Sequence, residues 1–79
     1  MKVYGIDAHL SGVRGQQRAI VAARSKVAAA KAMDLTVYFF NGYGDETGNA
    51  EEIATAMAKP GTVFTRPLDD FNAEWEELR

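Results

Sequence analysis

The first 23 residues predict a β-hairpin, and this unit constrains the fold more than any other part of the sequence. Residues 2–10 alternate between two sets of side chains, Tyr4, Ile6, Ala8 and Leu10 in one set and Val3, Gly5, Asp7 and His9 in the other. A period of two is typical of a strand that buries one face. Residues 11–15 form a short loop with glycine near each end, and residues 16–23 predict the second strand.

Residues 26–33 predict a helix that begins after Ser25. The hydroxyl of Ser25 can accept a hydrogen bond from a free backbone N–H of the first turn. The segment is rich in alanine, which loses almost no side-chain entropy in a helix. Because its side chains are small, this helix can lie close to a sheet.

Two interpretations are open for residues 35–43. The β-branched and aromatic side chains of residues 35–40 favour a strand. In the other interpretation, Thr36 is an N-cap and residues 37–43 form a short helix. Residues 25–43 would then be a helix-turn-helix unit.

The second half of the chain predicts one helix and one strand before the C-terminal tail. Asn49 is expected to cap a helix at residues 50–58, with Glu52 at the position of a capping box and with Ile53 and Met57 on the buried edge. Residues 62–66 predict a short strand, which Pro67 ends.

These elements predict a single α/β (α+β) domain over residues 1–79. Its small antiparallel sheet is expected to have three strands, from residues 2–10, 16–23 and 62–66. Two or three short helices are expected to pack against this sheet, on one of its faces. Within the domain, residues 68–79 predict an acidic amphipathic tail segment of helical periodicity, because Leu68, Phe71, Trp75 and Leu78 are spaced 3, 4 and 3 apart.

The net charge of −2 conceals a division of charge along the chain. Residues 1–44 contain six basic and two acidic residues, a balance of +4. Residues 45–79 contain nine acidic and three basic residues, a balance of −6. The acids of this second half predict a partner-binding surface made of Asp45, Glu46, Glu51, Glu52, Asp69, Asp70 and Glu74. A face of carboxylates can occupy a basic nucleic-acid channel of another protein, because the same field that steers DNA also steers the carboxylates.

Several function classes are disfavoured by what the sequence lacks. It has no cysteine, and its single histidine, His9, has only Asp7 nearby, so no metal site is expected. Its glycines match neither phosphate-binding pattern, and no group of side chains meets the geometric requirements of catalysis. We therefore expect a protein that is not an enzyme and that needs no cofactor or small-molecule substrate.

The basic residues of the first half indicate an alternative function. Arg14, Arg18, Arg24 and Lys26 could contact phosphates if residues 25–43 form the helix-turn-helix unit of a small DNA-binding regulator. Against this, the pI is about 5.2, whereas nucleic-acid-binding domains usually carry a basic excess. The recognition positions, residues 38–41, also look like apolar core material. Direct binding of nucleic acid is therefore not the first expectation.

Three stretches together resemble small phage-encoded anti-CRISPR proteins of the type I-C group. They are Val13–Ala23, Ser25–Leu35 and the run from Tyr43 to Phe64 that contains YGDETGN. The resemblance implies a non-catalytic inhibitor that binds a type I Cas surveillance complex, often at the Cas7 backbone subunit, and blocks target DNA binding. It supplies no individual site residue.

The expected location is the cytoplasm of the bacterial host cell, and a monomer is expected. No apolar run reaches the roughly 18 residues that a membrane span requires. The first seven residues already contain Asp7, which a signal peptide would not.

Overall fold

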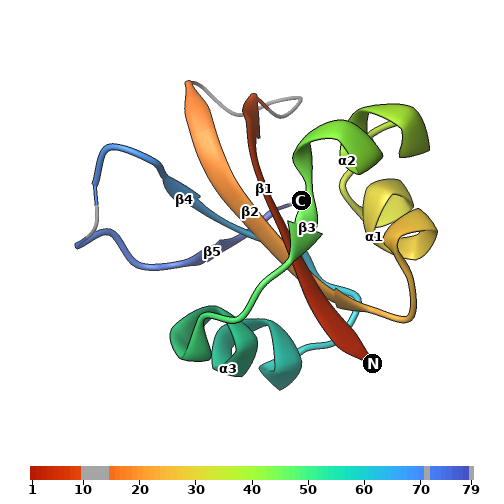
Figure 1. The fold of residues 1–79 in the computed structure, drawn as a ribbon. Coiled ribbons are helices and arrows are strands. Elements are labelled where there is room, and N and C mark those ends of the chain that lie inside the picture. Colours follow the sequence, from red (N-terminus) through yellow and green to blue (C-terminus); the bar gives the residue numbers. More distant parts are fainter. Residues whose placement is uncertain (10–14, 71, 79) are drawn as a thin grey trace.

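The protein forms an α+β fold in which an antiparallel sheet lies between helices. The computed structural model describes residues 1–9, 15–70 and 72–78. In those ranges it has three helices and five strands (Figure 1). The strands are β1 (Lys2–His9), β2 (Gln16–Ala23), β3 (Asp45–Glu46), β4 (Phe64–Pro67) and β5 (Glu76–Glu77). The helices are α1 (Lys26–Ala32), α2 (Val37–Tyr43) and α3 (Ala50–Ala58).

The order of strands in the sheet is β3-β1-β2-β4-β5, and every neighbouring pair is antiparallel. The three central strands, β1, β2 and β4, are the three that the sequence predicts. The hairpin of β1 and β2 pairs in a continuous register from Lys2 opposite Ala23 to His9 opposite Gln16. The two outer strands have two residues each and were not predicted, because acidic residues have low β-propensity.

Both faces of the sheet are covered, so the prediction that helices pack on one face is wrong. α1 and α2 lie against one face, and α3 lies against the other (Figure 1). Residues 19–23 of β2 are all buried, with Val21 in the core beside α1 and α2 and Ile20 in the core beside α3. Such a continuous apolar run is typical of a strand that is buried on both sides.

Residues 37–43 form a helix rather than a strand, as the second of the two sequence interpretations expects. The Thr36 hydroxyl accepts a hydrogen bond from Phe39 N at 3.1 Å, as Ser25 does from Ala28 N at 3.2 Å for α1. Phe40 is fully buried and meets the Tyr4 ring edge-on, with centroids 6.3 Å apart. Helix capping and the burial of Phe40 therefore outweigh the β-propensity of the segment.

α3 has the predicted limits but presents a different side to the sheet. Asn49 Oδ1 accepts from Glu52 N at 3.0 Å, which confirms the N-cap. The predicted buried edge is wrong, because Ile53 and Met57 are 38% and 44% exposed, whereas Glu52 and Ala56 are buried. Glu52 is drawn toward the sheet by a partner on β2, and this rotates Ile53 and Met57 outward.

Residues 68–78 do not form the predicted helix in the described part of the tail. A turn follows β4, in which Asp70 Oδ1 accepts from Asn72 N at 3.0 Å, and β5 then pairs with β4. Trp75 and Leu78 pack against opposite cores. A spacing of three places two side chains on one side of a helix but on opposite sides of a strand, and the sheet offers an apolar surface on each side. Phe71 lies outside the described residues.

Candidate functional site

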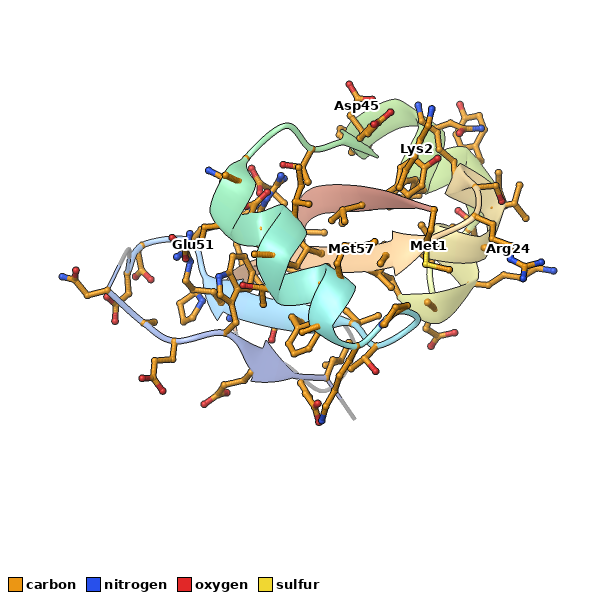
Figure 2. The ribbon with its side chains drawn as sticks, turned by 90° about the horizontal axis from the view of Figure 1, so that it is seen from below. Met1, Lys2, Arg24, Asp45, Glu51 and Met57 are labelled. Atoms are coloured by element: carbon orange, nitrogen blue, oxygen red, sulfur yellow. The ribbon has the colours of Figure 1, made fainter. Side chains whose placement is uncertain are left out.

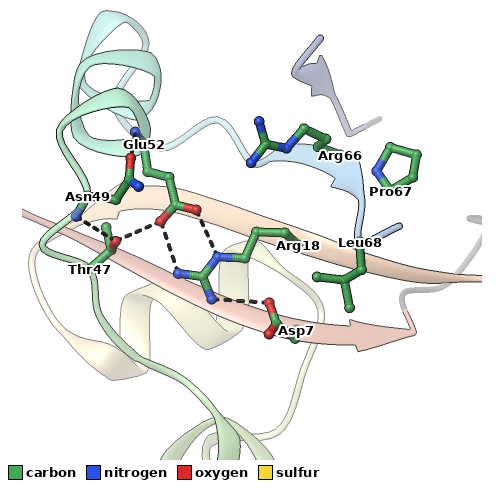
Figure 3. Close-up of a pocket in the computed structure, with 8 residues that line it drawn as sticks. All are labelled: Asp7, Arg18, Thr47, Asn49, Glu52, Arg66, Pro67 and Leu68. Carbon is green, nitrogen blue, oxygen red and sulfur yellow. Dashed lines mark hydrogen bonds and ion pairs between the residues drawn. The ribbon is translucent and has the colours of Figure 1, made fainter. Parts of the chain in front are cut away.

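A polar pocket lies between the first turn of α3 and the sheet (Figure 3). It is lined by Asp7, Arg18, Thr47, Asn49, Glu52, Arg66, Pro67 and Leu68. These residues come from β1, β2, β4 and the segments around α3, so the pocket forms only when the sheet and α3 are assembled. This pocket holds one of the acids predicted to bind a partner, Glu52.

Arg18 and Glu52 form the centre of a hydrogen-bonded ionic network in this pocket. Arg18 donates from Nε to Oε2 of Glu52 and from Nη2 to Oε1, both at 3.0 Å. Thr47 Oγ1 donates to the same Oε1 at 2.6 Å. Arg18 Nη1 also donates to Oδ1 of Asp7 at 3.3 Å. The Glu52 carboxylate thus accepts three hydrogen bonds, and the guanidinium joins two carboxylates.

The network keeps both central groups charged at neutral pH. Burial of Glu52 opposes its ionisation, but hydrogen bonds from Arg18 and Thr47 and the positive charges of Arg18 and Arg66 outweigh burial and lower the pKa of Glu52. The hydrogen bond with Glu52 raises the pKa of Arg18 and outweighs the opposing effect of desolvation.

Gly5 makes room for this network. A Cβ atom on Gly5 would lie 2.6 Å from Nη2 of Arg18, closer than side-chain contacts allow. The guanidinium therefore lies against the backbone of β1, where any larger residue would displace it. This explains why a glycine lies in the middle of β1, between the buried residues Tyr4 and Ile6.

The chemistry of the pocket fits a structural role better than a catalytic one. A carboxylate with a lowered pKa and two occupied oxygens is a weak general base. In residues 1–9, 15–70 and 72–78 no group of three or more His, Cys, Asp or Glu side chains could hold a metal ion. His9 is exposed at the end of β1, and the neighbouring Asp7 is bound to Arg18.

The first four acids of the predicted binding surface each have a partner inside the protein. Glu46 lies 3.4 Å from Lys2, and Asp45 lies 3.9 Å from Lys26. Glu51 accepts from Arg66 Nη1 at 3.2 Å and from Trp75 Nε1 at 3.1 Å. Glu52 is buried in the network described above, so its carboxylate cannot reach a partner protein.

Four of the acids that follow β4 differ from these because they have no ion-pair partner among the described residues. Asp69, Asp70 and Glu74 lie in the connection between β4 and β5, and Glu76 follows at the start of β5. All four are exposed, and none forms an ion pair with another described residue. We call Asp69, Asp70, Glu74 and Glu76 the acidic connection.

The seven predicted acids therefore do not form one surface. Asp45 and Glu46 make up β3 at one edge of the sheet, whereas the acidic connection leads into β5 at the other edge. Figure 2 shows Asp45 and Glu51 at separate places, with Glu51 beside the C-terminal segment. Sequence distance alone does not show this separation, because it depends on the order of strands.

Trp75 contacts α3 and β4 and so attaches the end of the acidic connection to the rest of the fold. The guanidinium of Arg66, on β4, lies 4.5 Å from the centre of the Trp75 ring. Glu51, on α3, accepts hydrogen bonds from both side chains. This arrangement links α3, β4 and the C-terminal segment, and it holds the acidic connection beside the sheet edge.

The basic residues of the predicted DNA-binding site are also divided. Arg18 is bound in the polar network, and Arg14 lies outside the described residues. Arg24 is exposed before α1, and Lys26 is half-buried in its first turn. Arg18 is therefore not free to contact phosphate.

Exposed aromatic side chains on α2 were missed by the sequence analysis. Tyr38 and Tyr43 are 91% and 73% exposed, and Phe39 is 37% exposed. Only Phe40 of this group is core material, so the objection that residues 38–41 are all buried is wrong. A signal was present in the helical interpretation, because Thr36 as N-cap leaves a seven-residue helix with room for one buried face.

Comparison with protein-family models, with curated proteins and with solved structures found no match to this chain. Among the described residues, no helix has the length and apolar character needed to cross a membrane.

Proposed function

We propose that the protein is a non-enzymatic inhibitor that binds a basic, nucleic-acid-binding surface of another protein through the acidic connection. In terms of the anti-CRISPR resemblance, the partner is a type I Cas surveillance complex, with Cas7 as the subunit bound, and the consequence is blocked target DNA binding. The observation that carries the proposal is the presence of four exposed carboxylates on one connection without an ion pair in the described ranges.

Unpaired carboxylates suit this role better than the paired ones near α3. A carboxylate beside Lys or Arg of its own chain has much of its field cancelled at a distance. Asp69, Asp70, Glu74 and Glu76 keep their full charge and can pair with Lys and Arg of a partner. Long-range attraction of this kind accelerates association and directs it to a basic surface.

The position of the acidic connection is also held by the fold. The Asp70 side chain accepts from Asn72 N and stabilises the turn, while Trp75 is bound by Glu51 and stacked under Arg66. A charged segment that is held in place loses less conformational entropy on binding than a free one.

Two charge-matched variants test the proposal. Asp69→Lys with Asp70→Lys changes the acidic connection, and Asp45→Lys with Glu46→Lys makes the same change in charge at β3. Binding to a purified, crRNA-loaded type I complex would be measured by biolayer interferometry. We expect the first variant to weaken binding roughly tenfold or more and the second to weaken it much less.

Equal loss in both variants would mean that net charge, and not the acidic connection, governs binding. Undiminished binding of the Asp69 and Asp70 variant would contradict the proposed surface. Circular dichroism of each variant confirms that it is folded before binding is compared.

A DNA-binding regulator that uses residues 25–43 is the second candidate, and the formation of both α1 and α2 favours it. α2 itself contains no Lys or Arg, so it would have few phosphate contacts of its own. A gel-shift assay with duplex DNA at low salt tests it, because such binding should weaken steeply as salt rises.

A further inference from the structure

The helix pair of α1 and α2 has a surface of its own, on the side of the sheet opposite α3. Tyr38, Phe39 and Tyr43 are exposed on α2, and the rings of Phe39 and Tyr43 lie 4.9 Å apart between centroids. With Asn41 and Gly42 they line a shallow hollow. An exposed tyrosine offers a flat π surface together with a polar hydroxyl.

Three basic residues lie on the neighbouring helix α1 or just before it. Arg24 and Lys31 are exposed and form no ion pair with another described residue. The ammonium group of Lys26 lies 3.9 Å from the exposed carboxylate of Asp45. An exposed ion pair this long contributes little free energy in solution. Because Asp45 is two residues beyond the end of α2, this contact places the start of α1 close to the end of α2.

We propose that the surface of α1 and α2 binds single-stranded nucleic acid. Bases stack on Tyr38 and Tyr43, and phosphates are bound by Arg24, Lys26 and Lys31. Aromatic rings beside unpaired cations are the combination that single-strand-binding proteins use, because every base has a π face and every linkage has a negative charge. This inference is independent of the proposed function, which uses the acidic connection.

Single strands fit this surface better than a duplex does. Stacking on a tyrosine requires an unpaired base, and a duplex keeps its bases stacked on one another. A duplex would instead need base-reading side chains on α2, where Asn41 is the one amide and charged residues are absent from the helix. The charge and the aromatic rings together therefore favour the unpaired strand.

Fluorescence anisotropy tests the proposal with labelled oligo-dT and oligo-rU of about 15 nucleotides, a size that spans one small binding site. A duplex of equal length is the comparison. We expect the single strands to bind more tightly than the duplex. Three phosphate contacts predict that log K falls with log salt with a slope of about −2. The two oligonucleotides distinguish DNA from RNA as the ligand.

Tyrosine variants show whether the aromatic ring, rather than the hydroxyl group, is needed for binding. Tyr38→Leu and Tyr43→Leu should each weaken binding about fivefold or more, because stacking on one ring is lost. Tyr38→Phe and Tyr43→Phe keep the π face and should bind as the natural protein does. Both tyrosines are exposed, so these changes leave the core intact.

Charge variants have a matched control. Lys31→Glu and Lys59→Glu change the net charge equally, but Lys59 lies just after α3, on the other side of the sheet. We expect the Lys31 variant alone to lose binding. Asp34→Asn should strengthen binding, because it removes a carboxylate from the turn between α1 and α2. Asp34 has φ 58°, a conformation that asparagine also accepts.

Three results would overturn the proposal. They are no binding of either single strand at about 50 mM salt, equal or tighter binding of the duplex, and unchanged binding in both Tyr→Leu variants. Tighter duplex binding would support the DNA-binding regulator instead. None of these results affects the experiment with the Cas complex, in which Asp69 and Asp70 are varied.

Discussion

The acids around α3 and the acids of the acidic connection differ in where their partners come from. Glu51 and Glu52 are bound by arginines of the same chain, at 3.2 and 3.0 Å, and they join α3 to the sheet. Asp69 and Asp70 have no such partner in the described residues. A count of acids along a chain therefore does not show which charges are available to another molecule.

Removing the charge of Glu52 should have the largest effect on stability. Glu52→Gln leaves the Arg18 guanidinium without its main partner in a site where Glu52 is 6% exposed. We expect the free energy of unfolding to fall by about 3 kcal/mol, the lower end for a broken buried pair because Arg18 is partly exposed. Urea denaturation measures this change.

Asp7→Asn is the control, because it changes the exposed partner of the same guanidinium. The loss there should be at most about 1 kcal/mol. If Asp7→Asn and Glu52→Gln destabilise the protein equally, burial does not determine how much each ion pair of Arg18 contributes to stability.

Gly5→Ala should disturb the same network from the other side. The added methyl group meets Arg18 Nη2 at 2.6 Å and must displace a guanidinium that Glu52 holds. A loss of about 1–3 kcal/mol is expected, as for other overpacked sites. Thermal unfolding followed by circular dichroism measures it.

Gly42→Ala should have the opposite effect on stability. The added methyl group meets open space on α2, and alanine is a better helix former than glycine. This variant should be stabilised by roughly 0.5–1 kcal/mol. A stabilised Gly5→Ala protein would show that the guanidinium moves aside without loss.

Acidification should lower the free energy of unfolding, because it protonates the Glu52 carboxylate. Its pKa is lowered in the folded state, so its contribution to stability is complete above the ordinary pKa of glutamate and is lost as the pH falls through the lowered value. The slope from one such group is at most about 1.4 kcal/mol per pH unit. Urea midpoints measured from pH 7 to the acidic range should fall more steeply for the natural protein than for Glu52→Gln. Parallel curves would assign the acid sensitivity to other groups.

Neutralising the acidic connection should have the smallest effect on stability. Asp69→Asn with Glu74→Gln removes two exposed charges that repel one another, so the change should lie within about 0.5 kcal/mol of zero. Differential scanning calorimetry provides the measurement. A large loss would mean that these carboxylates have partners within the protein and are not free for binding.

Local patterns were sufficient to predict much of the fold. The limits of β2 and α3 coincide with the predicted ranges 16–23 and 50–58, because alternation and capping are properties of neighbouring residues. The helix at residues 37–43 was one of two open interpretations. Its formation depends on the burial of Phe40 against Tyr4, a contact that lies outside the segment.

Features that depend on distant residues were not predictable. Glu52 and Arg18 are 34 positions apart, and nothing near Glu52 in the sequence marks it as buried. The tail has helical spacing, but pairing with β4 and two apolar surfaces around the sheet edge determine its structure. Three acids of the acidic connection, Asp69, Asp70 and Glu74, were named from the sequence, but Glu76 was not, and the division between paired and unpaired acids required the fold.

Trp75 makes the attachment of the C-terminal segment visible by spectroscopy. It is the single tryptophan of the chain, and its indole N–H is bound to Glu51 while its ring lies under Arg66. Its fluorescence therefore originates where α3 and β4 meet the end of the acidic connection. Detachment of that segment would expose the indole to water and shift its emission to longer wavelength before the rest of the protein unfolds. The chain thus carries its own optical reporter, and no dye needs to be attached to follow the segment.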